Sequence, residues 1–135
     1  MTRYLLDTNH LSPLVTVGHP LRQRVSVRLQ LGDEFAVPVP ALTELLYGIL
    51  LTPRAVQNLA EWQRLQNSFG YYLIQRQDAE AAAELQTDLR RRGWQLATVD
   101  ALIAAVALRH NLVLLTTDGD FAAAPGLHLE NWLER

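Results

Sequence analysis

The chain has 135 residues, of which 49% are hydrophobic, which suits one folded domain with a substantial core and not a disordered protein. It contains no cysteine, which excludes disulfides and cysteine-ligated zinc, and all 12 basic residues are arginine, which excludes a catalytic lysine. The net charge of -2 gives no whole-molecule attraction to nucleic acid, and no segment predicts a secretion signal or a membrane span, so we expect a cytoplasmic protein without membrane partners.

The first half of the chain predicts two strands and three helices. Short apolar runs that stop at acids or prolines are typical of strands, and apolar residues three or four apart are typical of helices. In chain order these are a strand at 3–6, a helix at 20–31, a strand at 35–37, and helices at 40–51 and 54–69. Pro40 suits the first turn of its helix. We expect the two consecutive helices to form a projecting pair.

The second half predicts three more strands and two more helices. In chain order these are a strand at 71–74, a helix at 78–92, a helix at 99–110, and strands at 112–116 and 127–129. Asp78 is the predicted cap of its helix, and Gly93 is a C-terminal stop. Because strands alternate with helical stretches, we expect an α/β fold with a central parallel sheet of about five short strands and helices on both faces.

Four carboxylates stand where a predicted strand ends or a predicted helix begins. They are Asp7, Glu44, Asp100 and Asp118. Open α/β sheets bind ligands outside the carboxyl ends of their strands, so the four acids converge if those ends are neighbours. Four unpaired carboxylates could not all stay charged so close together, and Mg²⁺ or Mn²⁺, which take oxygen ligands, would remove the conflict. The four acids are therefore the candidate catalytic residues and metal ligands.

Each acid also has a purely structural explanation. Asp7 and Asp100 can cap helices, and Glu44 in a first helical turn is favoured by the helix dipole. Asp118 before Gly119 is ordinary turn chemistry. The auxiliary candidates are short polar groups beside the acids, namely Thr8, Asn9, Thr116 and Asp120. The four histidines lack metal-like spacing, so we expect them at the surface or at helix ends, and the three tryptophans are expected to be core or interface anchors.

The acids lie in segments that occur in the same order in a known family. The segments are residues 4–9 with Leu11-Ser12, 43–48, 100–105, and 114–121 with 125–127. Together they span nearly the whole chain, which resembles a PIN-domain protein and specifically a VapC-type toxin ribonuclease of a type II toxin–antitoxin system. The four acids match the acidic positions of that family. The family often has Asn at the fourth position, so Asp118 and Asp120 compete for the metal-binding role.

The resemblance implies a three-layer PIN-like fold over residues 1–135 as a single domain. It implies one or two Mg²⁺ or Mn²⁺ ions at the four acids, metal-dependent cleavage of RNA, a homodimer, and a small cognate antitoxin that blocks the site.

Other proteins with acidic sites in an α/β fold agree less well with this sequence. Phospho-acceptor signalling domains and haloacid-dehalogenase-type phosphatases both need a lysine, and the latter also need a second Asp where this chain has Asn9. The alternative is a catalytically silent PIN-fold module that binds RNA or protein. Four intact acids argue against it, and metal-dependent cleavage of RNA would separate the two.

Overall fold

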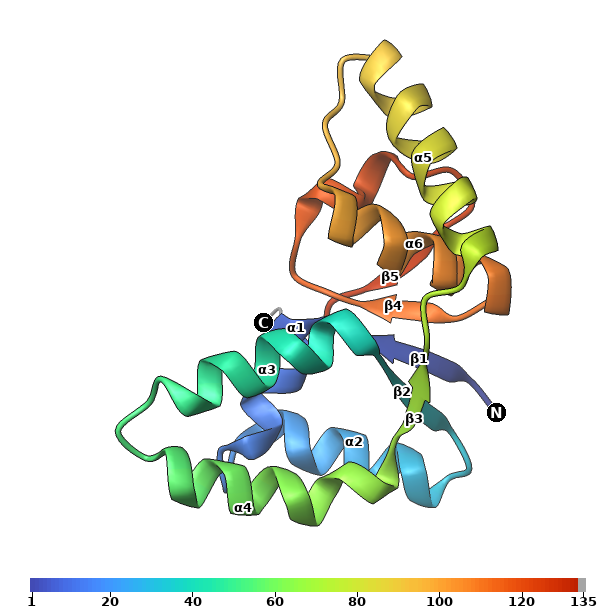
Figure 1. Cartoon of the computed structure of the whole chain (residues 1–135). Coiled ribbons are helices and arrows are strands. Elements are labelled where there is room, and N and C mark those ends of the chain that lie inside the picture. The colour runs from blue at the N-terminus through green and yellow to red at the C-terminus, as the bar shows by residue number, and fades with distance from the viewer. Residues whose placement is uncertain (134–135) are drawn as a thin grey trace.

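Five parallel strands form the single sheet of the computed structural model, which describes residues 1–133 (Figure 1). The strands are β1 (Arg3–Leu6), β2 (Glu34–Pro38), β3 (Gly70–Tyr72), β4 (Val113–Leu115) and β5 (His128–Glu130), in the spatial order β3-β2-β1-β4-β5. The central strand is β1, with β2 and β3 on one side of it and β4 and β5 on the other. The predicted parallel α/β sheet of about five short strands is confirmed.

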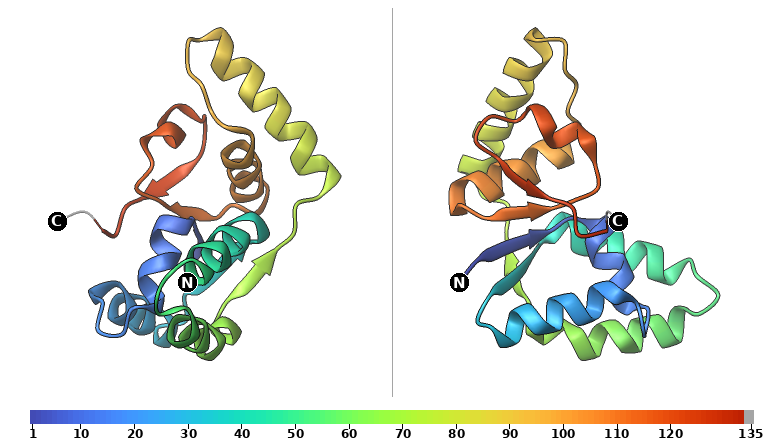
Figure 2. Two further views of the ribbon diagram at one scale, coloured as in Figure 1. Left: turned by 60° about the vertical axis from the view of Figure 1, so that its left-hand side comes forward. Right: turned by 180° about the vertical axis from the view of Figure 1, so that it is seen from behind.

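Helices cover both faces of this sheet (Figures 1 and 2). The α-helices are α1 (Thr8–Leu11), α2 (Pro20–Gln30), α3 (Val39–Leu50), α4 (Ala55–Leu65), α5 (Arg76–Arg91) and α6 (Thr98–His110). The 3-10 helices are η1 (Ser12–Val15), η2 (Gln66–Ser68) and η3 (Gly119–Ala123). None of the helices within residues 1–133 is both long and apolar enough to cross a membrane.

The five predicted long helices are present, with small differences at their ends. The helix expected over 54–69 is α-helical only to Leu65, and η2 then carries the chain into β3. Three elements were missed, namely α1, η1 and η3. Each has only four or five residues, which is too short for apolar periodicity to be visible in the sequence.

The core consists of two apolar layers, one on each side of the sheet. Side chains of a strand alternate between the faces, so Tyr4 and Leu6 belong to the layer under α2, α3 and α4, whereas Leu5 belongs to the layer under α5 and α6. In the first layer Tyr4 stacks on Phe35 with ring centroids 4.9 Å apart, and Trp132 meets Tyr4 edge-on at 4.9 Å. The second layer is rich in alanine, which lets α6 approach the sheet closely.

The expected helical pair is formed by α3 and α4. Figure 1 shows α3 leading away from the sheet and α4 returning beside it toward β3. Apolar side chains at the far end of the pair are largely exposed, including Tyr47, Leu50, Leu51 and Val56 at 64–80%. The pair therefore carries an apolar surface that its own chain leaves uncovered.

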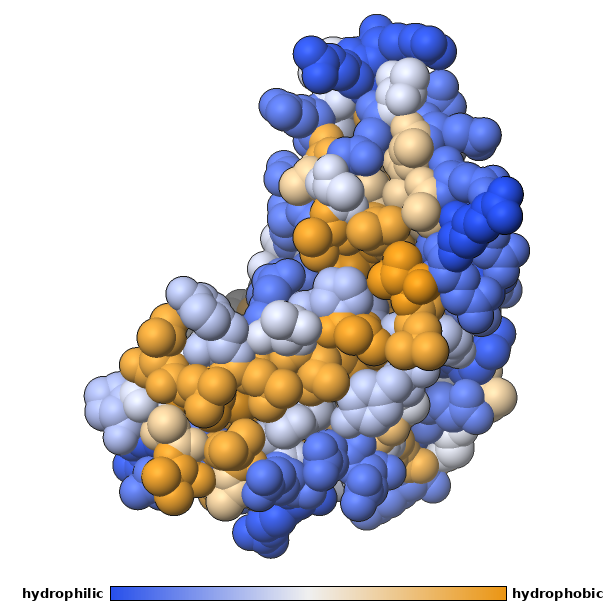
Figure 3. Space-filling view, in the orientation of Figure 1, coloured by the Kyte–Doolittle hydropathy of each residue, from blue (hydrophilic) through white to orange (hydrophobic). Residues whose placement is uncertain are grey.

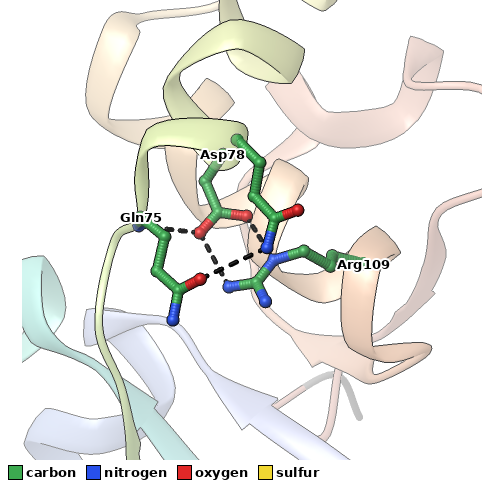
Figure 4. Close-up of polar contacts among 4 residues, drawn as sticks. Gln75, Asp78 and Arg109 are labelled. Atoms are coloured by element: carbon green, nitrogen blue, oxygen red, sulfur yellow. Dashed lines mark hydrogen bonds and ion pairs between the residues drawn. The ribbon is translucent and has the colours of Figure 1, made fainter.

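An ion pair between a buried carboxylate and a partly exposed arginine joins the start of α5 to the end of α6 (Figure 4). Arg109 donates to both oxygens of the Asp78 carboxylate, at 2.7 and 2.9 Å, and Asp78 is only 1% exposed. The prediction that Asp78 itself caps α5 is wrong, because the cap is Gln75. Asp78 is the third helical residue, and its carboxylate accepts the Gln75 backbone N–H at 2.9 Å as the reciprocal half of a capping box.

We predict that Arg109→Met lowers the melting temperature by roughly 5 °C or more, because it leaves a buried carboxylate without its cation. The hydrogen bonds from Arg109 lower the pKa of Asp78 below its usual 3.8. This stabilisation is therefore complete above pH 3.8 and is lost as the pH falls through the lower folded pKa. Thermal denaturation of both proteins at neutral and acidic pH measures it.

The matched control is Arg76→Met on the same helix. Arg76 pairs with Glu80 at 3.0 Å, but the two side chains are 93% and 64% exposed, so this pair contributes little. Equal losses of melting temperature in the two variants would contradict the assignment.

Candidate metal centre

Asp7 lies at the carboxyl edge of the sheet and also caps α1. It directly follows β1, and its backbone N–H donates to the Leu115 carbonyl at the end of β4. Its Oδ1 accepts the Thr8 N–H at 2.9 Å, and its Oδ2 accepts the Thr116 hydroxyl at 2.7 Å. Asp7 is 7% exposed. The capping role and the strand-end position thus coincide in one residue, and the side chain is held in one orientation.

Asn9 and Thr116 connect the segment after β1 to the segment after β4. The Asn9 amide donates to Asp7 Oδ2 at 3.2 Å and to Thr116 Oγ1 at 3.3 Å, and its carbonyl oxygen accepts the Thr117 N–H at 3.0 Å. Thr116 Oγ1 also accepts the backbone N–H of Asp118 at 3.0 Å. Both residues therefore fix the geometry around the acids.

His10 supports Asn9 from the interior. It lies in the last turn of α1, so it is a helix-end residue, one of the two expected placements, although it is not at the surface. Its side chain is fully buried, and Nε2 accepts the Trp132 backbone N–H at 2.9 Å. Nδ1 must then carry the proton, which it donates to Asn9 Oδ1 at 2.8 Å. Burial, with a smaller effect of Arg24, lowers the pKa of His10 to about 4, so the ring is neutral.

Three other acids meet beside this network. Asp100 lies in the first turn of α6, Asp118 follows β4, and Asp120 lies in η3. One carboxylate oxygen from each lies within 4.8 Å of the other two. Asp118 Oδ1 accepts the Asp120 N–H at 2.9 Å, which holds the turn between them. Both members of the competing pair thus lie at the centre.

Glu44 reaches the same place from α3. Its side chain is exposed, and its Oε2 accepts the Thr8 hydroxyl at 3.2 Å. Glu44 is thereby tied to the segment that begins with Asp7. Asp100, Asp118 and Asp120 therefore form the close group, and Asp7 and Glu44 lie beside it with the auxiliary residues Thr8, Asn9 and Thr116 at the carboxyl edge of the sheet.

The pKa of Asp100 is raised by its surroundings. Burial raises its pKa to about 6, and the carboxylates of Asp7, Asp118, Glu44 and Asp120 add to the shift in that order. A cluster of oxygen donors with this much negative charge fits a hard divalent cation such as Mg²⁺ or Mn²⁺. The donors present therefore suit the metal that the sequence predicted.

Comparison with known proteins agrees with this geometry. The family model described as the PIN domain matches residues 4–127. The chain belongs to the PIN-domain family. Ribonuclease VapC4 of Mycobacterium tuberculosis is 33% identical over 100 residues, which cover 73% of this chain and 77% of the relative.

Solved structures place the chain among the VapC-type PIN domains. The crystal structure of VapBC2 from Rickettsia felis bound to a promoter DNA fragment contains a chain that is 26% identical, with a TM-score of 0.84, over 97% of this chain and 99% of that one. A chain of a toxin–antitoxin complex from Klebsiella pneumoniae is 25% identical, with a TM-score of 0.69, over 92% and 94%. The predicted VapC-type PIN-domain ribonuclease is confirmed as the family of this chain.

We predict that, in excess EDTA at about pH 7.5, Asp100→Asn melts at a higher temperature than the unaltered chain. The folded pKa of about 6 lies above the unfolded value of 3.8, so the folded chain loses stability as the pH rises between them, and the loss is constant above the folded pKa. The difference in melting temperature between the two proteins should therefore disappear toward pH 4.

Asp88→Asn is the control, because Asp88 is an exposed acid on α5 that is not one of the clustered acids. Added Mn²⁺ should raise the melting temperature of the unaltered chain more than that of Asp100→Asn, because a ligand that binds the folded state stabilises it. A lower melting temperature for Asp100→Asn in EDTA would show that Asp100 is structural.

Proposed function

We propose that this chain hydrolyses RNA phosphodiesters with Mg²⁺ or Mn²⁺ held by its carboxylates, as the toxin of a toxin–antitoxin pair. The observation that carries the proposal is the convergence of acids that follow β1, lie on α3 and follow β4 around Asp100 on α6. Burial raises the pKa of Asp100 to about 6, and these acids add to the shift. A fold without a ligand at this edge has no physical reason to gather these charges.

The roles of the residues follow from their geometry. Asp100, Asp118 and Asp120 offer carboxylate oxygens close enough to share one cation. Asp7 and Glu44 add negative charge beside them. When bound, the cation supplies Lewis acidity, which activates water and neutralises charge on the phosphate.

The supporting residues keep the carboxylates in place. Asn9 and Thr116 hold the Asp7 carboxylate in a fixed orientation, and Thr116 also holds the backbone that leads to Asp118. Because water is the nucleophile, the mechanism needs no cysteine, and the chain has none.

We predict that Asp7→Asn lowers the rate of RNA cleavage by about 100-fold or more and relieves growth arrest on expression, and that EDTA stops cleavage by the unaltered chain. The substitution keeps the shape of the side chain but removes its charge. Cleavage of a labelled RNA pool with Mg²⁺, with Mn²⁺ and in chelator measures both effects.

Asp88→Asn serves again as the control for loss of one acid. Cleavage that persists in excess chelator would refute the metal requirement. RNA binding without cleavage by the unaltered chain would favour the catalytically silent alternative.

We further propose a homodimer and a cognate antitoxin as partners, acting in the cytoplasm, where the RNA substrate is. For the dimer, the support is the apolar patch formed by Tyr47, Leu50, Leu51 and Val56 on the helical pair. Figure 3 shows this apolar surface as an orange band over α3. For the antitoxin, the support is the similarity to a chain of a toxin–antitoxin complex.

We predict that Leu50→Arg shifts the chain from dimer to monomer at micromolar concentration, because a charge would be buried at the centre of the apolar patch. Sedimentation of both proteins measures the change. Leu31→Arg is the matched control, since Leu31 is 68% exposed and lies at the end of α2, before β2, and not on the helical pair. A monomeric unaltered chain, or a dimer in Leu50→Arg, would contradict the proposed interface.

A further inference from the structure

A polar groove lies between α5 and the segment that leads from α5 to α6. It encloses about 310 Å³. Its walls are formed by Ala83, Gln86, Thr87 and Arg90 of α5 and by Trp94, Gln95 and Leu96 of the connecting segment. Figure 3 shows the surface over the end of α5 as strongly hydrophilic. Of these residues Leu96 also belongs to the apolar layer under α5 and α6, and none belongs to the helical pair.

Hydrogen bonds connect both walls of the groove to the segments that carry the clustered acids. The Trp94 indole N–H donates to the backbone carbonyl of Asp120 at 2.8 Å. The Gln86 amide donates to the Leu96 carbonyl at 3.0 Å and to the Thr98 hydroxyl at 3.2 Å, and Thr98 begins α6 two residues before Asp100. One wall of the groove thus contacts the backbone of Asp120 directly, and the other contacts Thr98, two residues before Asp100.

The groove combines an exposed aromatic face with a positive charge. Trp94 is 38% exposed, whereas Trp62 and Trp132 are 2% and 7% exposed, so of the two expected roles, core or interface anchor, Trp94 does not have the core one. Arg90 is exposed and forms no ion pair within the described residues 1–133. In a chain of net charge -2 with an acidic centre, RNA needs such local contacts to be held.

We propose that this groove is a subsite for one nucleotide of the RNA next to the cleaved bond, and the inference rests on the function proposed above. The base stacks on the Trp94 ring, and the Arg90 guanidinium binds a neighbouring phosphate. Stacking on an aromatic face tolerates every base and needs an unpaired one, so the subsite selects single-stranded RNA.

Three variants separate binding in the groove from support of the metal centre. Trp94→Phe keeps an aromatic face but removes the N–H that holds Asp120, whereas Trp94→Ala removes both. Arg90→Gln removes the charge alone. The matched control is Arg76→Gln, which makes the same change of charge at the opposite end of α5.

Steady-state cleavage of a single-stranded oligoribonucleotide with Mn²⁺ should show KM raised about tenfold in Trp94→Ala and in Arg90→Gln. KM should stay within about threefold of the unaltered value in Trp94→Phe and Arg76→Gln. Loss of the Asp120 contact should appear in kcat, in both Trp94 variants. Circular dichroism of each variant establishes that it is folded.

A binding experiment makes the test independent of cleavage. In EDTA, the same oligoribonucleotide should quench the fluorescence of Trp94, the exposed tryptophan, and the quenching should be absent in Trp94→Phe and weaker in Arg90→Gln. Double-stranded RNA of equal length should quench less.

The outcomes distinguish the subsite from the function on which it rests. Cleavage with unchanged KM in both Trp94→Ala and Arg90→Gln would overturn the subsite and leave the proposed function standing. Quenching without cleavage by the unaltered chain would overturn the proposed function and support an RNA-binding groove. Quenching by an antitoxin peptide but not by RNA would assign the groove to a protein partner and overturn the proposal.

Discussion

The metal centre depends on the register between β1 and β4. These strands pair in parallel with Leu6 opposite Leu115, so the residues that follow them leave the sheet side by side. The bond from the Thr116 hydroxyl to Asp7, between residues 109 apart in sequence, is possible only in this register. A shift of one strand by one residue would turn its side chains to the other face, so Leu6 and Leu115 could no longer both lie in the same apolar layer. The apolar core itself therefore protects the geometry of the site.

Much of this arrangement could be predicted from the sequence because parallel strands end at a common edge. An acid after a buried strand is visible locally, as with Asp7, and so is an acid in the first turn of an apolar helix, as with Asp100. Contacts between distant segments were not predictable. Nothing near His10 indicates that it accepts a hydrogen bond from Trp132, 122 residues away. The burial of Asp78 depends in the same way on Arg109, which the sequence places on another helix.

Charge is distributed unevenly around the centre, and this distribution connects stability with activity. The acids from four parts of the chain repel one another, so the fold keeps a locally unfavourable arrangement that the apolar layers on both sides of the sheet must stabilise. Cations lie farther out, where Arg90, Arg91 and Arg92 end α5. In the proposed function, a polyanionic substrate would meet arginines at the rim and acids at the centre, and a bound divalent cation would make the centre favourable for a phosphate.

The hydrogen bond between His10 and Trp132 has a consequence for biosynthesis. The central strand β1 is made first, but its neighbour β4, the loop with Asp118 and Asp120, and the Trp132 backbone that positions Asn9 through His10 all come from the end of the chain. While those residues are still inside the ribosome, the nascent chain has Asp7 and Glu44 but no complete site. The candidate site can therefore be assembled only after translation has brought out nearly all of the residues of the chain.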